Sequence, residues 1–429
     1  MKIAVWHNLP SGGGFRALFD QVRGLVRGGH QVEIWCPESA ERILLPIDQV
    51  AKVHRLPLSA AGHSVLRNDA FRLAWQRYKT VQHALRALEN HVRQCAEEIQ
   101  QGEFDVILAH PSRLFYMHPL ARFTQIPSVL YLQEIYRCIH EARPALPWEA
   151  LPDPVRRYGS PSYWRWFAIN LLDTQTDRMV MREERKAAME WDAILCNSFF
   201  SRETIVRAYG IDARVCYLGI DTSSFSPTTG VRSNYLLGLG GLDINKCVHL
   251  AIEALGQLPM KGRPALKWVC NYTNSQYQQQ CEALARHLGV DFVCETRLPE
   301  EFLRIRLQQA LALVYPSCLE PFGYAPLEAN ACGTPVIAIA EGGIRETVQD
   351  GVNGLLIENR QPVNWAAAIS RLITEPGLQE KLARQSIAWV GQKWTVDAAA
   401  ARLERELESV VSKGKRNNSA ESVMKVPAL

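Results

Sequence analysis

The chain has no long apolar run and no cysteine pattern on which a fold could depend. No apolar stretch reaches the roughly 18–20 residues of a membrane span. Met1 and Lys2 lead directly into an expected strand, so we expect no signal peptide. The eleven cysteines are scattered without a Cys-x-x-Cys pair, which argues against a zinc site and a disulfide framework. These absences predict buried thiols in a reducing cytoplasm.

An excess of charge of one sign is also missing. The formal net charge of +4 and the pI near 8.4 are too small to predict a nucleic-acid partner. With 21% charged and 47% hydrophobic residues, the composition is that of an ordinary globular protein. A length of 429 residues suffices for two or three domains with substantial cores.

The chain does have a regular alternation of strands and helices. Residues 2–6 are predicted to form a strand, Gly12 to Gly14 open a helix that ends near Arg27, and residues 31–35 return as a strand. The alternation resumes after a Ser/Thr/Pro-rich linker that ends near Thr229. It predicts two α/β domains with doubly wound parallel sheets. We place the domains at residues 1–218 and 219–394 and expect residues 413–429 to be disordered.

The glycines of the first turn match a dinucleotide-binding fingerprint only formally. The match is Gly12-x-Gly14-x-x-Ala17. The loop that begins at His7 is too long for the tight turn of that fingerprint, and Glu33 lies inside its strand instead of at the tip. We therefore do not expect NAD as a cofactor.

The densest local pattern lies between Cys318 and Thr347. Glu320 follows a predicted buried strand and precedes a helix expected to begin near Phe322 or Gly323, with Glu328 about two turns along it. A second short strand leads into another glycine turn at residues 341–343. Such turns present free backbone N–H groups at the carboxyl edge of a parallel sheet, where ligands bind.

The segment from Glu320 to Glu328 resembles the E-x7-E signature of retaining glycosyltransferases of family 4. Residues 333–338, 342–348 and 350–356 are similar to the same family, in the same order. The resemblance implies the GT-B fold, in which two Rossmann-like domains face each other across a cleft. It also implies that a helix at residues 395–412 crosses back to the first domain, and that the anomeric configuration of the sugar is retained.

A sugar-nucleotide donor leaves a diphosphate, so its transition state needs fixed cations and N–H donors near the phosphates. Lys246 is the main catalytic candidate for that role. The turns at Gly13 and Gly14 and at Gly323 and Tyr324 are expected to contribute backbone N–H groups.

The resemblance assigns further substrate contacts. It implies that Glu328 holds the ribose hydroxyls and that Glu320 touches the sugar. Glu320 could act as a nucleophile or orient the sugar hydroxyls, and we favour the orienting role. Leu298, before a helix start, is expected to flank the base, and Phe322 is expected to contact the substrate.

One position departs from the family pattern. Relatives usually have Gly-Arg-Leu where this chain has Gly240, Gly241 and Leu242, and in them the arginine pairs with the diphosphate. Losing one such donor typically costs about 10²–10³ in rate. Either another cation such as Arg16 takes the role of the missing arginine, or the protein is slow, differently specialised or inactive. Gly241 itself is still expected to be a substrate-binding position.

His110 is a third catalytic candidate because it ends a predicted buried strand. Side chains at strand carboxyl ends project into the ligand crevice of a doubly wound sheet. The same residue could instead be a hydrogen-bonded structural histidine. Gln133, at the end of the next strand, falls where many relatives carry a histidine.

Two segments leave membrane contact open. Residues 54–93 are rich in arginine and lysine, and residues 144–189 join prolines to a cluster that contains Tyr163, Trp164 and Phe167. Both can be solvated or packed surfaces, or they can meet anionic lipid at the inner face of a membrane. Absence of co-sedimentation with anionic liposomes at low salt would remove the lipid interpretation.

Taken together, the sequence predicts a hexosyltransferase that uses a UDP- or GDP-sugar and a hydroxyl acceptor. Glycan, polysaccharide or glycolipid synthesis is the expected context, with an acceptor that can be lipid-linked. Two alternatives stay open: a catalytically degenerate nucleotide-binding homologue, and a sugar-nucleotide epimerase on the same fold.

No metal cofactor is expected, because the chain lacks an Asp-x-Asp motif and a lysine at the phosphates makes a divalent cation unnecessary. Transfer from the nucleotide-sugar donor should therefore proceed at an unchanged rate in excess EDTA. A strict requirement for added Mg²⁺ or Mn²⁺ in the same assay would contradict this prediction.

Overall fold

The computed structural model describes residues 1–414, apart from residues 11, 41–44, 59–69, 142–157 and 231. The expected disorder of residues 413–429 thus falls almost entirely outside the described residues. The described chain forms two compact units. Unit 1 contains residues 1–196, 202–216 and those from 403 onward, and unit 2 contains residues 197–201 and 217–402.

Unit 1 is built on a seven-stranded parallel sheet in the order β3-β2-β1-β4-β5-β6-β7. Its strands are β1 (Lys2–Asn8), β2 (Gln31–Pro37), β3 (Lys52–Leu56), β4 (Val106–Ser112), β5 (Ser128–Tyr131), β6 (Ala193–Cys196) and β7 (Arg214–Val215). The central strand β1 pairs on both sides, with Ile3 opposite Val32 and Val106. Such strands are covered on both faces, which is why they read as continuous apolar runs.

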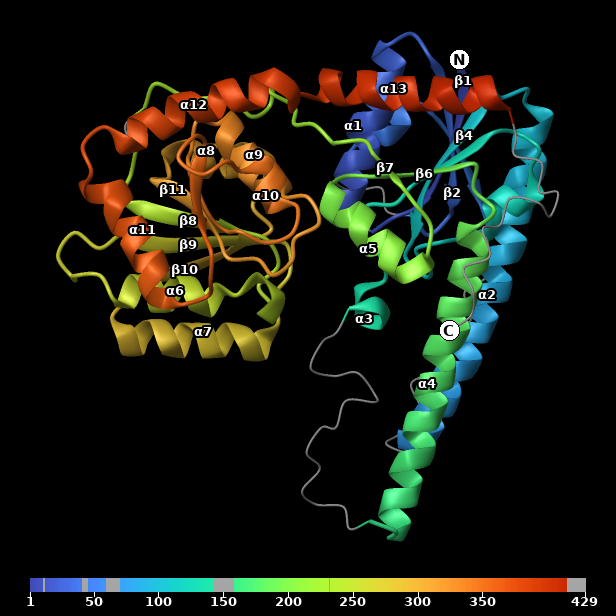
Figure 1. The fold of residues 1–429 in the computed structure, drawn as a ribbon, viewed down its shortest axis with the longest axis horizontal. Coiled ribbons are helices and arrows are strands. Elements are labelled where there is room, and N and C mark those ends of the chain that lie inside the picture. Colours follow the sequence, from blue (N-terminus) through green and yellow to red (C-terminus); the bar gives the residue numbers. More distant parts are fainter. Residues whose placement is uncertain (11, 41–44, 59–69, 142–157, 231, 415–429) are drawn as a thin grey trace. The chain divides into compact units, whose positions relative to one another are not determined.

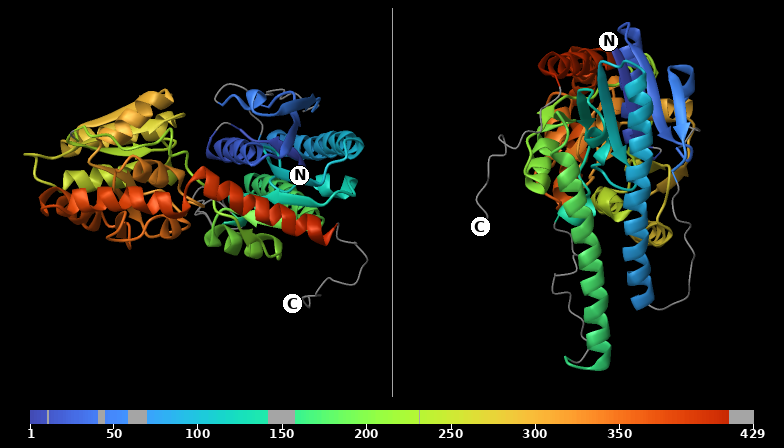
Figure 2. Two further views of the ribbon diagram at one scale, coloured as in Figure 1. Left: turned by 90° about the horizontal axis from the view of Figure 1, so that it is seen from above. Right: turned by 90° about the vertical axis from the view of Figure 1, so that its right-hand side faces the viewer.

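Helices connect these strands and cover both faces of the sheet (Figure 1). They are α1 (Gly13–Arg27), α2 (Ala70–Gln101), α3 (Arg137–His140), α4 (Pro161–Ala188) and α5 (Phe199–Tyr209), with 3-10 turns η1 (Ile47–Gln49) and η2 (Pro119–Phe123). Helices α2 and α4 pack side by side and extend beyond the sheet (Figures 1 and 2). Among the described helices, none is long and apolar enough to cross a membrane.

Unit 2 contains a six-stranded parallel sheet in the order β10-β9-β8-β11-β12-β13. Its strands are β8 (Tyr235–Leu239), β9 (Ala265–Cys270), β10 (Phe292–Thr296), β11 (Ala312–Tyr315), β12 (Val336–Ile339) and β13 (Gly354–Ile357). The core between sheet and helices is mainly aliphatic and includes the fully buried Trp268 and Trp365.

The helices of unit 2 also lie on both faces of their sheet (Figure 1). They are η3 (Ile244–Lys246), α6 (Val248–Gly256), α7 (Ser275–Leu288), α8 (Glu300–Gln309), α9 (Tyr324–Ala331), α10 (Ile344–Thr347), α11 (Pro362–Thr374), α12 (Leu378–Lys393) and α13 (Val396–Lys413). Helix α13 is divided between the units, since its residues up to Arg402 belong to unit 2 and those from Leu403 to unit 1.

The expected pair of doubly wound parallel sheets is confirmed. The helix expected to begin near Phe322 or Gly323 is α9, which begins at Tyr324, and the helix expected at residues 395–412 is α13, which spans Val396–Lys413. Strand β3 and helix α5 were not expected from the sequence. Both are short elements with weak periodicity, which tertiary packing completes.

A buried amide pair ties together the elements around the predicted signature segment. Asn330 on α9 donates from Nδ2 to the carbonyl oxygen of Asn353 (3.0 Å), and Asn353 donates from Nδ2 to Oδ1 of Asn330 (2.6 Å). Both side chains are fully buried. Because buried amides without partners are costly, this reciprocal pair fixes α9 against the turn before β13.

Candidate functional site

The order of the strands in unit 2 reverses between β8 and β11. From β8 the chain proceeds outward through β9 to β10, and then returns to β11 and proceeds the other way through β12 to β13. In open parallel sheets, ligands bind outside the carboxyl ends of the strands at such a switch point. The loops after β8 and β11 carry Lys246 and Glu320, and a hydrogen bond from the Cys318 N–H to the Asn245 carbonyl (2.8 Å) joins them.

Lys246 and Glu320 form an ion pair at this switch point. Nζ of Lys246 lies 2.7 Å from Oε2 of Glu320 and 3.1 Å from Oγ of Ser317. Ser317 in turn donates from Oγ to Oε2 of Glu320 at 2.8 Å. Each charged side chain is about a fifth exposed, so the pair is reachable from solvent.

Both groups stay charged over a wide pH range. Burial alone would raise the pKa of the Glu320 carboxyl, but the Lys246 ammonium and the hydrogen bonds around it outweigh burial and hold that pKa below 4.5. Burial likewise would lower the pKa of Lys246, whereas Glu320 raises it well above 10.5. The site therefore presents a permanent cation beside a permanent carboxylate.

Two adjacent glycines of one turn, Gly342 and Gly343, fix the backbone of Glu320. The N–H of Gly343 donates to the Glu320 carbonyl at 2.8 Å. A Cβ on Gly342 would overlap the backbone of Glu320, and Gly342 also has a φ of +59°. Only glycine permits this close approach, which explains the local glycine requirement of the second turn.

Backbone strain is concentrated beside the candidate residues. Four described non-glycine residues have positive φ, and three of them adjoin a predicted site position. Cys247 follows Lys246, Leu319 precedes Glu320, and Arg297 precedes Leu298. Left-handed conformations cost energy in non-glycine residues and cluster at functional sites, so this distribution supports a ligand site.

Gly241 lies against the ring of Tyr272, which fills the space beside it. A Cβ at this position would overlap the phenol, so an arginine here would displace the tyrosine. The Tyr272 hydroxyl donates to Oδ2 of Asp243 at 2.5 Å, which holds the ring in place. A tyrosine from the loop after β9 thus occupies the space beside Gly241.

A second cation, Arg360, reaches the switch point from the loop after β13. It donates from Nη2 to Oε2 of Glu341 (2.6 Å) and from Nη1 to the Pro316 carbonyl (3.0 Å), and its Nη1 also contacts Sγ of Cys247. The guanidinium therefore lies between Cys247, which follows Lys246, and Pro316, which precedes Ser317. Its side chain is 31% exposed.

Arg360, Glu341 and Ser317 were not among the predicted site residues. All three follow carboxyl ends of strands, β13, β12 and β11 respectively, so the strand-end rule applied to His110 would have found them. The sequence alone did not show that the loop after the edge strand β13 returns toward β11.

The remaining predicted residues of unit 2 lie on α9, just before it, or after β10. Glu328 lies on α9 and is only 5% exposed. Phe322 is buried, its ring 5.4 Å from that of Tyr324, and Gly323 caps the N-terminus of α9 with a φ of +97°. Leu298 is half-buried after the edge strand β10.

In unit 1, Gly13 and Gly14 begin α1 at the switch point between β1 and β4. Gln133 donates from Nε2 to the Gly14 carbonyl at 3.0 Å, so it holds the glycine turn in place. Gly13 is exposed and Gly14 is half-buried.

His110 lies within β4, which extends to Ser112 and does not end at His110 as expected, and the residue is fully buried in unit 1. Burial, with His7 and His118 nearby, lowers its pKa to about 3, so the ring is neutral. Its ring lies 5.7 Å from that of Tyr131. In this conformation His110 has no exposed surface with which to contact a substrate, so a catalytic role requires it to become accessible.

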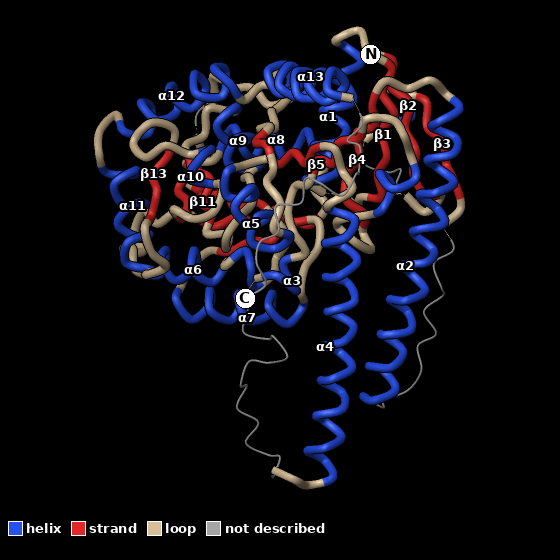
Figure 3. The backbone as a smooth tube through the Cα atoms, turned by 45° about the vertical axis from the view of Figure 1, so that its right-hand side comes forward, coloured by secondary structure: helices blue, strands red, loops and turns tan. Residues whose placement is uncertain are grey.

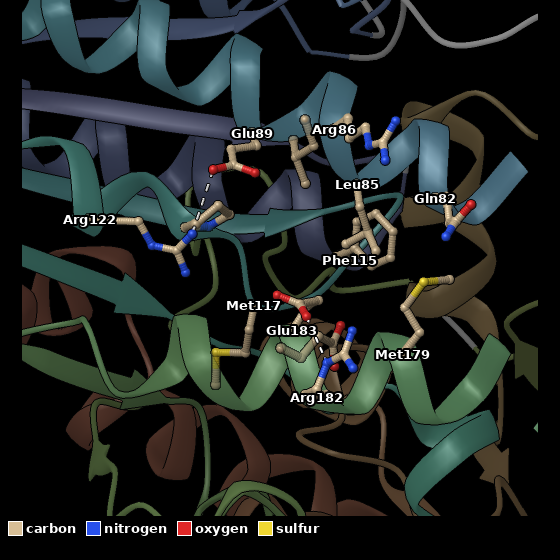
Figure 4. Close-up of a pocket in the computed structure, with 13 residues that line it drawn as sticks. Gln82, Leu85, Arg86, Glu89, Phe115, Met117, Arg122, Met179, Arg182 and Glu183 are labelled. Atoms are coloured by element: carbon tan, nitrogen blue, oxygen red, sulfur yellow. Dashed lines mark hydrogen bonds and ion pairs between the residues drawn. The ribbon is translucent and has the colours of Figure 1, made fainter. Parts of the chain in front are cut away.

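A separate cavity of about 200 Å³ lies in unit 1 between α2, α4 and η2. Figure 4 shows apolar side chains such as Phe115 and Met117 beside the charged residues Arg86, Arg122 and Glu183. None of the predicted site residues lines it. The described residues also contain no group of three or more His, Cys, Asp or Glu placed to hold a metal ion.

Two family models together match almost the whole described chain. The model described as Glycosyltransferase Family 4 matches residues 11–224, and the model described as Glycosyl transferases group 1 matches residues 220–389. The first matches unit 1 for the most part, and the second matches the part of unit 2 that carries the Lys246–Glu320 pair.

Curated relatives include D-inositol 3-phosphate glycosyltransferases. That of Geodermatophilus obscurus is 30% identical over 58% of this chain and 60% of its own length. That of Acidothermus cellulolyticus is 31% identical over 46% of this chain and 49% of its own length. The chain thus spans about half to three fifths of the curated relatives it matches.

Solved structures share the fold over nearly the whole chain. Sucrose-phosphate synthase from Thermosynechococcus elongatus has a TM-score of 0.70 at 16% identity, with 96% of this chain and all of that chain covered. HepE from Anabaena, solved with UDP and glucose, has a TM-score of 0.66 at 20% identity, with 95% and 100% covered. These similarities establish the GT-B fold.

The Lys246–Glu320 ion pair should contribute the same amount to the free energy of unfolding over a broad pH range. Glu320 has a depressed pKa, so its stabilisation is present above pH 4.5 and is lost as the pH falls through the folded value. Lys246 has a raised pKa, so its stabilisation is present below pH 10.5 and is lost as the pH rises through the folded value. Between these limits the coupling should be constant.

A double-mutant cycle of Lys246→Met and Glu320→Gln, followed by urea unfolding, should give a coupling of about 1–3 kcal/mol. We expect the same value at about pH 6, 7.5 and 9. A coupling that changes by more than half across this range would show that one partner titrates within it and would contradict the assignment.

Proposed function

The chain belongs to glycosyltransferase family 4, and from this premise we propose that it moves a hexose-type sugar from a nucleotide-diphosphate donor to a hydroxyl acceptor. The observation that carries the proposal is the Lys246–Glu320 pair, held with Ser317 at the switch point of unit 2. We propose a UDP- or GDP-sugar as the donor, with retention of the anomeric configuration and without a metal ion.

Lys246 supplies charge for the leaving diphosphate. In the unliganded chain its ammonium is balanced by Glu320 and Ser317. A diphosphate that enters the switch point offers a stronger anionic partner, and the N–H groups at the start of α9 add donors. Negative charge that develops on the phosphate oxygens during transfer then meets a cation already in place.

Glu320, released from full engagement with Lys246, then faces the sugar. Its carboxylate, to which the Ser317 hydroxyl still donates, is proposed to accept hydrogen bonds from the sugar hydroxyls. We favour this orienting role over a covalent one, because its backbone is fixed by Gly343 and its carboxylate is already hydrogen-bonded by Ser317. Glu328 is proposed to hold the ribose hydroxyls from α9.

The acceptor is a hydroxyl compound, in glycan, polysaccharide or glycolipid synthesis. The curated relatives are glycosyltransferases of D-inositol 3-phosphate, and the HepE structure contains UDP and glucose. A lipid-linked acceptor and a position at the inner face of a membrane stay hypotheses from the sequence.

A degenerate nucleotide-binding homologue is the second candidate function, and Gly241 is the observation that favours it. Arg360 weakens this alternative, because it places a second cation, beside Lys246, within reach of the same loop. We propose that Arg360 exchanges Glu341 for the diphosphate when the donor binds. An epimerase is distinguished by turnover of the nucleotide-sugar without any acceptor.

Metal-free calorimetry with UDP, GDP, ADP and NAD tests the donor site. One nucleoside diphosphate should bind, and Glu328→Ala should weaken it by at least about tenfold, because the ribose contacts are lost. Absence of binding by all four ligands would overturn the donor site and favour the degenerate homologue.

Arg360→Gln provides a second test. It should weaken binding of the nucleoside diphosphate by about 10–100-fold while leaving the corresponding nucleoside unchanged, because only the phosphates carry charge. Glu341→Gln should strengthen diphosphate binding, since it removes the competing carboxylate. Arg371→Gln, at an exposed arginine paired with Glu375, is the matched control and should have no effect. Equal losses for the nucleoside and its diphosphate would indicate a structural role for Arg360.

A further inference from the structure

The loop that carries Lys246 is held from the side by the loop after β9. The N–H of Leu242 donates to the Tyr272 carbonyl at 3.0 Å, and the N–H of Asn274 donates to the Leu242 carbonyl at 2.9 Å. The first loop continues through η3 into α6, the second leads into α7, and these two helices pack side by side (Figure 3). The two loops therefore form one backbone unit beside the switch point.

The Tyr272 side chain lies against the loop that carries Lys246. A Cβ at Gly241 would come within 2.3 Å of the Tyr272 ring, and one at the neighbouring Gly240 would come within 3.2 Å of Cε of Lys246. The tyrosine ring and the lysine stem thus lie against successive glycines. Because Tyr272 is 60% exposed, its ring gains little from burial, and the hydrogen bond of its hydroxyl is a main restraint on its position.

The Tyr272 hydroxyl acts on the Lys246 turn through Asp243. The hydroxyl donates to Oδ2 of Asp243 at 2.5 Å, while Oδ1 of Asp243 accepts the N–H of Asn245 at 2.8 Å and so caps η3. The Asp243 carbonyl also accepts the N–H of Lys246 at 3.1 Å. One aspartate thus holds the turn that presents Lys246, and both of its carboxylate oxygens are hydrogen-bonded.

Asp243 is also a second carboxylate within electrostatic reach of the Lys246 ammonium. Burial would lower the pKa of Lys246, whereas Glu320 and, more weakly, Asp243 raise it. Burial and the nearby Asp243 raise the pKa of Tyr272 to about 12, so its hydroxyl stays a donor at neutral pH. Without that hydroxyl, Oδ2 of Asp243 would lose its partner and compete with Glu320 for the ammonium.

We infer that Tyr272 is a positioning residue of the donor site: through Asp243 it holds the turn that directs Lys246 at the diphosphate, and it keeps the aspartate from competing for the ammonium. The inference rests on the proposed function, because it names a further residue on which the proposed diphosphate contact depends. Tyr272 itself does not contact the phosphates. In a chain with glycine at position 241, the tyrosine adds no charge but fixes the cation that is present.

A double-mutant cycle in metal-free calorimetry tests the inference on the full chain, with UDP or GDP as the probe, whichever binds more tightly. Tyr272→Phe should weaken binding of the diphosphate by about three- to tenfold, because it removes only the hydroxyl, and binding of uridine or guanosine should not change. In a Lys246→Met background, the same substitution should weaken the diphosphate by less than about twofold, since the cation that it positions is gone. Tyr158→Phe, at a tyrosine of unit 1 that is 80% exposed, is the matched control and should bind as the wild type does.

Unfolding in urea gives a readout that needs no ligand. The coupling between Lys246 and Glu320, from the cycle of Lys246→Met and Glu320→Gln, should fall by at least about half when it is measured in the Tyr272→Phe chain, because Asp243 then shares the ammonium. A tyrosine with a purely structural role would lower the stability of all four members of the cycle equally and leave the coupling unchanged.

Three results would overturn the inference. An equal loss for the nucleoside and its diphosphate, or an equal loss with and without Lys246, would show that Tyr272 contacts the ligand itself. An unchanged Lys246–Glu320 coupling in the Tyr272→Phe chain would show that the tyrosine does not position Lys246. If neither UDP nor GDP binds the wild type, the proposed donor site fails, whereas the coupling measurement still decides the role of Tyr272.

Discussion

A lysine ammonium that is four-fifths buried must be balanced by oxygen, and the switch point of unit 2 is arranged to balance it. Glu320 and Ser317 supply the oxygens, and both come from the loop after β11, next to the strand that leads to Lys246. The pair requires the loop after β11 to turn sharply, which Leu319 achieves in a left-handed conformation and which Gly342 and Gly343 permit by their close approach. The glycine turns and the strained residues thus serve one electrostatic constraint.

In the proposed function, the same constraint prepares the site for a diphosphate. A cation already held by a carboxylate and a hydroxyl needs little reorganisation when phosphate oxygens take their place, and such preorganisation is the main source of electrostatic catalysis. Arg360 and Glu341 repeat the arrangement on the other side of the loop. In the proposed function, the two cations of these pairs, Lys246 and Arg360, turn to the diphosphate when it displaces their carboxylates, in a chain whose residue 241 is glycine.

The parallel sheets and the Lys246, Glu320 and glycine-turn positions could be predicted because apolar runs, strand ends and glycine spacing are local signals. Tyr272 and Arg360 could not be predicted in the same way, because their roles depend on which loops meet in space. His110 shows the limit of the strand-end rule, since its side chain is enclosed by unit 1 although its strand ends at a switch point. The exposure of Trp164 and Phe167 likewise depended on which face of α4 packs against α2.

A crystal structure of the chain with a bound nucleoside diphosphate would test the central claim most directly. The account predicts phosphate oxygens within hydrogen-bond distance of Nζ of Lys246, with the contact to Glu320 lengthened from 2.7 Å. A nucleotide bound elsewhere, with the Lys246–Glu320 contact unchanged, would contradict the assignment of this switch point as the donor site.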